Sequence, residues 1–225
     1  MRKFDFLFFF TLLLVTSNLF AQKDVTMFLG IPIDGSKDEM LNKLKSKGFK
    51  NNPNSRDVLS GEFNGTDVNI HVVTNNNKVY RIMVTDVNTR NESDIKIRYN
   101  NLCQQFSNNK KYIHAVTDAK CEISDDEDIS FQMLVKDKRY EAIYYQISDS
   151  TPEDLQSFIS SKYPPEQLVD ISSEFRDQII EDYSSYFAQT QTKKVVWYMI
   201  TENSGRYNIT MYYDNEYNNA NGEDL

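Results

Sequence analysis

Two alternating runs of residues joined by a short polar turn constrain the fold of this chain more than any other feature. The first run, residues 66–74, reads TDVNIHVVT, and the second, residues 79–87, reads VYRIMVTDV. In the first run Val68, Ile70 and Val72 recur at every second position, which places them on one face of a strand. The intervening NNNK supplies turn residues, so the two runs predict an antiparallel hairpin.

A helix signature precedes this hairpin. Residues 34–49 read DGSKDEMLNKLKSKGF. Ser36 and Glu39 have the spacing of a capping box, in which each side chain accepts a hydrogen bond from a free backbone N–H of the other residue. Gly48 supplies the left-handed conformation that often ends a helix. The run VLSGEFN at residues 58–64 predicts a further strand, so the first half reads as a helix followed by three antiparallel strands.

A second unit of helix and strands begins near residue 91. Apolar side chains spaced by four, three and four residues predict a long helix with one buried stripe, formed by Ile95, Tyr99, Leu102 and Phe106. The alternating run ISFQMLV at 129–135 and the run RYEAIYYQI at 139–147 predict a hairpin that turns at KDK.

The end of the chain adds helices and a last hairpin. Residues 151–163 and 172–189 predict two helices, the first capped by Thr151 with Pro152 at its first position. The runs KVVWYMITE and RYNITMYYD predict a hairpin that turns at Asn203-Ser204-Gly205. The fold class is therefore α+β, an antiparallel β-sheet with helices packed on it. The order of elements allows two αβββ-like units, 28–88 and 91–214, with a helical insertion, inside one domain at 22–225.

The N-terminus predicts export. Arg2 and Lys3 precede the apolar run FLFFFTLLLV, and Ala21 is a small residue suited to cleavage. This is the layout of a signal peptide at residues 1–21, and its apolar run is shorter than the roughly 20 residues that a membrane span needs. We therefore expect cleavage after Ala21, a periplasmic or secreted protein, and no membrane span after cleavage; an uncleaved anchor is the alternative.

Charge and motifs narrow the function further. The net charge of −8 disfavours nucleic acid and anionic membrane surfaces as partners. The two histidines, His71 and His114, have no ligand spacing to each other or to a cysteine, and the chain lacks the G-x-S-x-G, P-loop, dinucleotide-binding and H-E-x-x-H motifs. We therefore expect no cofactor, no metal site and no catalytic residue. A carboxylate pair of a glycan or peptide hydrolase stays open as an alternative, because acidic residues are plentiful.

The sequence leaves open whether the two cysteines form a disulfide or remain buried thiols. Cys103 and Cys121 form an even pair, which can close a disulfide in an exported protein. Cys103 also lies beside the apolar stripe of the predicted helix, where a buried thiol would fit equally well.

Tyrosines supply the candidate ligand-binding residues. Consecutive tyrosines in YYQ and MYYD must point to opposite faces of a strand, so one of each pair should leave the core face. We expect ligand-facing aromatic side chains among Tyr144, Tyr145, Tyr198 and Tyr212. The leading hypothesis is a non-enzymatic exported protein that binds an unknown protein or glycan partner, and a carbohydrate-binding module with a tyrosine face is the alternative. Tyrosine is also a good strand former at a half-wet surface, which would explain these residues without a ligand.

The acidic tail does not fit a calcium loop. Residues 214–225 read DNEYNNANGEDL and begin with suitable ligands. However, Asn219 stands where the calcium loop of an EF-hand needs glycine, and Leu225 stands where it needs a bidentate glutamate. We expect the last strand to run through Tyr212 or Tyr213, with turn residues from Asn218 to Gly222.

The stretches FLGIPIDGSKDEMLNKLKSKGF, VTNNNKVYRIMV and ITMYYDNEYNNANGEDL resemble an uncharacterised group of secreted proteins from gut-type Bacteroidetes. This resemblance implies origin and export and implies no activity. The first helix and the strands after it also resemble SmpA/OmlA-type and β-lactamase-inhibitor-like small domains. The chain lacks the lipid-anchor cysteine of the SmpA/OmlA pattern, which puts a role in outer-membrane assembly in doubt.

Overall fold

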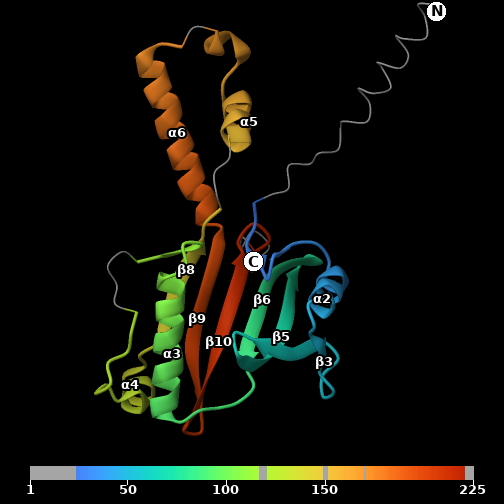
Figure 1. Cartoon of the computed structure of the whole chain (residues 1–225), viewed down its shortest axis with the longest axis vertical. Coiled ribbons are helices and arrows are strands. Elements are labelled where there is room, and N and C mark those ends of the chain that lie inside the picture. The colour runs from blue at the N-terminus through green and yellow to red at the C-terminus, as the bar shows by residue number, and fades with distance from the viewer. Residues whose placement is uncertain (1–23, 117–120, 149–151, 170, 221–225) are drawn as a thin grey trace, which may run out of the picture.

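A computed structural model describes residues 24–116, 121–148, 152–169 and 171–220. The predicted signal peptide and its cleavage site, the Thr151 cap and residues 221–225 of the tail lie outside these ranges. The described part is an α+β fold built on an eight-stranded antiparallel sheet (Figure 1). A small separate hairpin, β1 (Met27–Phe28) and β2 (Ile31–Pro32), precedes it.

The sheet has a mirror-like strand order, β3-β4-β5-β6-β10-β9-β8-β7. The first half of the chain supplies one half of the sheet and the second half supplies the other, and β6 meets β10 in the middle. Each half has its own preceding helix, α2 (Lys37–Ser46) or α3 (Glu92–Ser107). The strands are β3 (Lys50–Asn51), β4 (Val58–Phe63), β5 (Thr66–Asn75), β6 (Lys78–Asp86), β7 (Tyr112–His114), β8 (Glu141–Gln146), β9 (Lys194–Asn203) and β10 (Arg206–Asn215).

The helix α2 (Lys37–Ser46) forms as its capping signals predict. The Ser36 side chain accepts a hydrogen bond from the Glu39 backbone, and the Glu39 side chain accepts one from the Ser36 backbone. Gly48 follows the helix with a φ of 103°, a conformation that glycine adopts without strain. The capping box therefore sets where the first helix begins.

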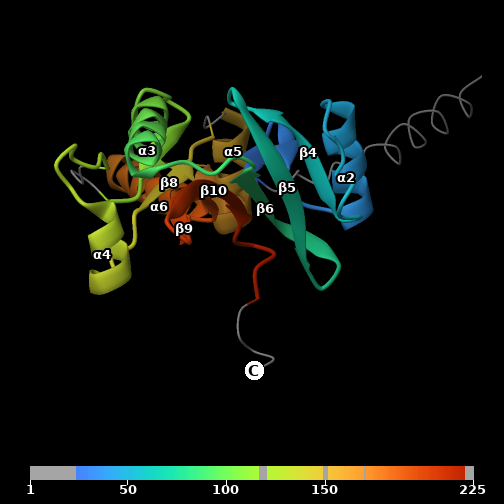
Figure 2. The same cartoon turned by 90° about the horizontal axis from the view of Figure 1, so that it is seen from below.

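The helix α3 (Glu92–Ser107) begins at the cap residue Asn91 and buries the predicted stripe. Figure 2 shows α2 and α3 on the same side of the sheet. Their apolar side chains join those of the strands in one core, which includes Met40 and Leu44 of α2 and Tyr99 of α3. The sheet thus has one face covered by helices.

The helix α4 (Ile129–Lys136) contradicts the predicted strand at 129–135 and the hairpin at 129–147. Its cap Asp128 accepts a hydrogen bond from the Phe131 backbone. Ile129 is fully buried and Met133, one turn later, packs on the core, whereas Phe131 is 46% exposed. The alternation in this segment was therefore coincidental, and only the positions at helical spacing reach the core. The strand β8 pairs with β7 and β9 instead.

The predicted helical insertion is present as α5 (Pro152–Lys162), the 3-10 helix η1 (Pro165–Leu168) and α6 (Ser173–Gln191). This insertion projects away from the sheet at the top of Figure 1. It has its own small core of Phe158, Tyr163 and Ile179. The last hairpin, β9–β10, turns at Ser204-Gly205 as predicted, and β10 continues to Asn215, two residues beyond the expected end.

Candidate functional site

The face of the sheet opposite α2 and α3 is the candidate site. Cross-strand partners align there in three rows, which we call the open face. One row runs Val58, His71, Met83, Tyr212, Trp197 and Ile143; the rows beside it are Val73, Arg81, Asp214, Val195, Tyr145 and Ile113, and Ser60, Asn69, Thr85, Thr210, Met199 and Glu141. Most of these side chains are half-buried, whereas their neighbours along each strand lie in the core.

A stacked aromatic pair forms the centre of the open face. The rings of Trp197 and Tyr212 lie 3.9 Å apart, centroid to centroid, with 13° between their planes. The guanidinium carbon of Arg81 lies 5.0 Å from the Tyr212 ring centroid and 5.6 Å from that of Trp197, within the range of cation–π attraction. Met83 and Ile143 flank the pair in the same row. The middle of the open face is therefore aromatic and apolar, with one cation against it.

A buried carboxylate fixes this centre. Asp214 accepts hydrogen bonds from Arg81 Nε at 2.6 Å, Arg81 Nη2 at 2.7 Å and Trp197 Nε1 at 2.9 Å. Its side chain is 5% exposed, and that of Arg81 is 27% exposed. The hydrogen bonds to Asp214 raise the pKa of Arg81, although burial opposes this. Arg81 stays charged, and the Trp197 ring is held by both its stacking partner and its N–H bond.

The four predicted tyrosines divide between the two faces. Tyr145 and Tyr212 lie on the open face and are half-buried, so they can reach a ligand. Tyr144 and Tyr198 are 1% and 0% exposed in the core under α3, so the expectation that they face a ligand is wrong. Alternation correctly sent the consecutive tyrosines of YYQ and of MYYD to opposite faces. It did not tell which face of β8 and β9 the helices cover.

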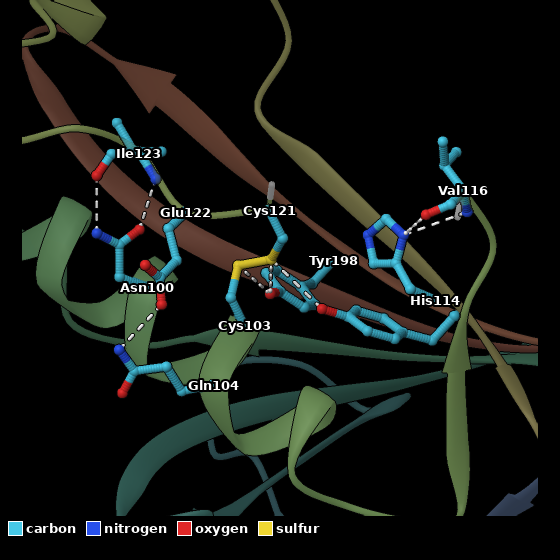
Figure 3. The surroundings of a disulfide bond; sticks show 10 residues. Asn100, Cys103, Gln104, His114, Val116, Cys121, Glu122, Ile123 and Tyr198 are labelled. Carbon is cyan, nitrogen blue, oxygen red and sulfur yellow. Dashed lines mark hydrogen bonds between the residues drawn. A yellow bond between two sulfur atoms is a disulfide. The ribbon is translucent and has the colours of Figure 1, made fainter. Parts of the chain in front are cut away.

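The buried tyrosines instead support the disulfide that joins Cys103 of α3 to Cys121 (Figure 3). The Tyr198 hydroxyl donates to the Cys103 sulfur at 3.0 Å. The Tyr144 hydroxyl lies 3.3 Å from the Cys121 sulfur. Burial, with the nearby Tyr144 and Tyr99, raises the pKa of Tyr198, which keeps this hydroxyl protonated as a donor. The bridge and its tyrosines are a structural element of the core.

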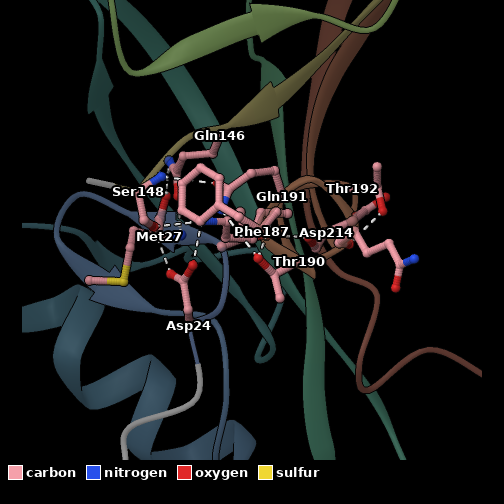
Figure 4. A network of polar contacts seen from close by, with 12 residues as sticks. Asp24, Met27, Gln146, Ser148, Phe187, Thr190, Gln191, Thr192 and Asp214 are labelled. Carbon is pink, nitrogen blue, oxygen red and sulfur yellow. Dashed lines mark hydrogen bonds and ion pairs between the residues drawn. The ribbon is translucent and has the colours of Figure 1, made fainter. Parts of the chain in front are cut away.

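A second polar cluster lies where the segment before β1 meets β8 and β9 (Figure 4). Lys194 Nζ donates to Asp24 Oδ2 at 2.6 Å and to Ser148 Oγ at 2.5 Å, and Ser148 Oγ donates to Asp24 Oδ1 at 2.7 Å. Burial lowers the pKa of Lys194, but the Asp24 carboxylate acts against this. The serine proton points to the carboxylate and the lysine is the donor, which is opposite to a serine nucleophile activated by a lysine base. The cluster ties the N-terminal segment to the sheet.

The two buried aspartates of the described ranges are both ion-paired. The buried Asp86 is neutralised by Arg90 at 2.7 Å and Arg98 at 3.3 Å, and the buried Asp214 is neutralised by Arg81. Each of these two carboxylates accepts hydrogen bonds from arginine side chains, so neither is a free general acid or base. Within those same ranges, no three His, Cys, Asp or Glu side chains could together hold a metal ion.

The histidines are far apart in the fold. His71 is half-buried on the open face, two strands from Tyr212. Burial, with the positive charge of Lys37, lowers its pKa. His114 in β7 lies against the Tyr144 ring, with 4.9 Å between ring centroids, and its Nδ1 lies 2.7 Å from the Val116 carbonyl oxygen.

Three residues that position the site were not singled out from the sequence. Trp197 is the cross-strand partner of Tyr212, and Arg81 is the cross-strand partner of Asp214, which lies two residues after Tyr212 on β10. The sequence signal for Trp197 was its place directly before Tyr198 in KVVWYMITE, because consecutive strand residues point to opposite faces. The ion pair of Arg81 and Asp214 joins residues 133 positions apart, and sequence spacing gave no sign of it.

Comparison with known proteins assigns no family to this arrangement. No family model matches the chain, and neither a curated protein nor a solved structure is similar to it at a significant level. In the described part of the chain, no helix is both long and apolar enough to cross a membrane.

Proposed function

We propose that this chain is a non-catalytic exported protein that binds a partner protein on its open face. The observation that carries this proposal is the central row of Met83, Tyr212, Trp197 and Ile143, whose side chains are half-buried in the middle of a broad sheet. A large aromatic and apolar surface that is contiguous and accessible to solvent is typical of an interaction site.

The composition of the open face favours a protein partner. The centres of protein interfaces are rich in tryptophan, tyrosine, methionine and arginine and poor in lysine and glutamate. The centre of the open face contains Trp197, Tyr212, Met83 and Arg81, and its carboxylate Asp214 is buried and paired. A partner that covers this centre therefore desolvates aromatic and apolar surface without isolating a charge.

A glycan fits the open face less well. A sugar ring stacks on a free aromatic face, whereas Trp197 and Tyr212 each use one face on the other. The neighbouring polar side chains also satisfy one another: Ser60 donates to Asn69 at 2.8 Å, and the hydroxyls of Thr85 and Thr210 are 3.3 Å apart. Few donors and acceptors are left over for sugar hydroxyls, so a glycan is the second outcome that the experiment must distinguish.

The exported location is part of the proposal and rests on the pattern of residues 1–21. It is supported by the pairing of Cys103 with Cys121, because disulfides persist in oxidising compartments. Mass spectrometry of the protein from its own cells gives the mature N-terminus. A chain that begins at Gln22 is expected, and a chain that retains residue 1 would exclude cleavage.

Site-specific photo-crosslinking tests the binding surface. A benzoylphenylalanine is placed at Ile143 on the open face, and, as the matched control, at Asn42, which is exposed on α2. After irradiation in the cells that make the protein, we expect a discrete protease-sensitive adduct at position 143 alone. The same probe combined with Trp197→Ala should lose most of the adduct, because that change removes the central ring.

Other crosslinking results would contradict a protein partner on the open face. An adduct at position 143 that resists protease and carries sugar mass would assign the open face to a glycan. Equal adducts at positions 143 and 42, or none at either, would overturn the proposed binding surface.

A further inference from the structure

A groove on the helix-covered face lies apart from the open face. It has a volume of about 760 Å³ and lies between the C-terminal ends of α2 and α3, above β10. Its apolar lining comes from Leu29, Phe49, Phe63, Phe106, Met211 and Tyr213. The polar side chains of Lys47, Glu62, Asn64, Gln105, Asn109 and Tyr112 complete the lining, so the groove offers both apolar walls and polar groups to a small molecule.

The Tyr213 hydroxyl distinguishes this groove from a simple packing defect. The residue Tyr213 is 4% exposed, and its hydroxyl has no hydrogen-bond partner among the described residues. In those same ranges, every fully enclosed side-chain nitrogen or oxygen atom has a partner. The Tyr213 hydroxyl must therefore keep contact with open space, and the groove that Tyr213 lines provides this space. A buried polar group without a partner is a point where a ligand can bind.

The charges around the groove define the chemistry of such a ligand. Burial, with the nearby Tyr112, raises the pKa of Tyr213, so its hydroxyl is a permanent hydrogen donor. Among the described lining residues Lys47 is the one cation and Glu62 the one anion, and both are exposed. A carboxylate at the depth of Tyr213 would be desolvated without a partner of opposite charge, which is costly. An uncharged oxygen acceptor has no such cost.

We infer that this groove binds a small uncharged molecule with an apolar body and a carbonyl-type oxygen that accepts a hydrogen bond from the Tyr213 hydroxyl. The site is separate from the open face and does not depend on the proposed partner protein. Asn64 and Gln105, whose side chains form a hydrogen bond of 2.7 Å, line the mouth of the groove.

Benzophenone is the test molecule, because it is uncharged and carries one carbonyl between two apolar rings. Diphenylmethane is its matched control, with a similar shape and no acceptor. In a ligand-detected NMR titration of the whole protein we expect benzophenone to bind about fivefold more tightly than diphenylmethane, the contribution of one hydrogen bond. Tyr213→Phe should erase this difference and leave diphenylmethane binding unchanged.

Two further variants locate the binding. Gln105→Trp places a large ring at the mouth of the groove and should weaken binding of both molecules, whereas Asn101→Trp, one turn away on the exposed side of α3, should not. Trp197→Ala should leave benzophenone binding intact, because that residue lies on the open face. No binding to the unmodified protein up to the solubility limit, an unchanged preference in Tyr213→Phe, or loss of binding in Trp197→Ala would each overturn the inference.

Discussion

Replacing Asp214 by asparagine tests the proposed support of the open face. The change removes one negative charge and keeps the shape of the side chain. In the protein, both carboxylate oxygens accept hydrogen bonds, from Arg81 at 2.6 and 2.7 Å and from Trp197 at 2.9 Å. The amide group of asparagine can accept with one oxygen only, so its NH₂ must face a donor of Arg81 or Trp197.

The expected loss of stability follows from burial. A hydrogen bond to a charged group contributes about 1.5–3 kcal/mol, and breaking a fully buried ion pair costs about 3–5 kcal/mol. Asp214 is 5% exposed, but Arg81 is 27% exposed and can recover part of its hydration. We therefore expect Asp214→Asn to lower the free energy of unfolding by about 2–3 kcal/mol, from the lower half of the combined range.

Urea unfolding followed by tryptophan fluorescence measures this loss. Trp197 is the sole tryptophan of the chain, so the signal reports on the open face itself. Asp67→Asn, at an exposed position of β5, is the matched control and should change stability by less than about 0.5 kcal/mol. In an Arg81→Met background, Asp214→Asn should cost less than about 1 kcal/mol, because the main partner is gone. A loss below about 1 kcal/mol in the unmodified background, or an equal loss in both backgrounds, would refute the reasoning.

Three other perturbations test the fold. Reduction of the Cys103–Cys121 bridge, whose ends are 18 residues apart, should cost about 3 kcal/mol of unfolding free energy in urea, and a Cys103→Ala/Cys121→Ala variant should be insensitive to the reductant. Gly61→Ala should destabilise by about 1–3 kcal/mol, since the new Cβ would meet the Phe49 ring at 2.6 Å; unchanged thermal unfolding would contradict this. Burial and Lys37 lower the pKa of His71 below the ordinary value of about 6.5, so acidification below that value should destabilise the protein, and His71→Gln should flatten the pH dependence of stability on the acid side of about pH 6.5.

Local signals predicted most elements because their causes are local. The capping box joins Ser36 and Glu39, three positions apart, and α2 begins where this pair indicates. The helix α3 begins near residue 91, as its apolar stripe predicts, and Asn91 caps it. The two-residue turn at Ser204-Gly205 needs positive φ at both positions, which the structure shows as 54° and 73°. Such features require no knowledge of the rest of the fold.

The segment at α4 failed because two periodicities competed in eight residues. Ile129, Phe131, Met133 and Val135 alternate as in a strand, while Ile129 and Met133 also have helical spacing. Asp128 provided the deciding signal, since it caps the helix through the Phe131 backbone. The position of Asp128 directly before an apolar run is typical of a helix cap.

The sequence by itself determined the fold class, the capping box of α2, the hairpins β5–β6 and β9–β10, and the alternation that sends Tyr144 and Tyr145 to opposite faces. The tertiary structure alone decided which face is open. The strands β8 and β9 carry apolar or aromatic side chains on both faces, so alternation cannot tell the core side from the solvent side. That choice was made when α3 packed over Tyr144 and Tyr198, and it left Trp197 and Tyr212 stacked on the other side. The contacts that define both candidate sites join residues far apart in the chain, and only folding brings them together.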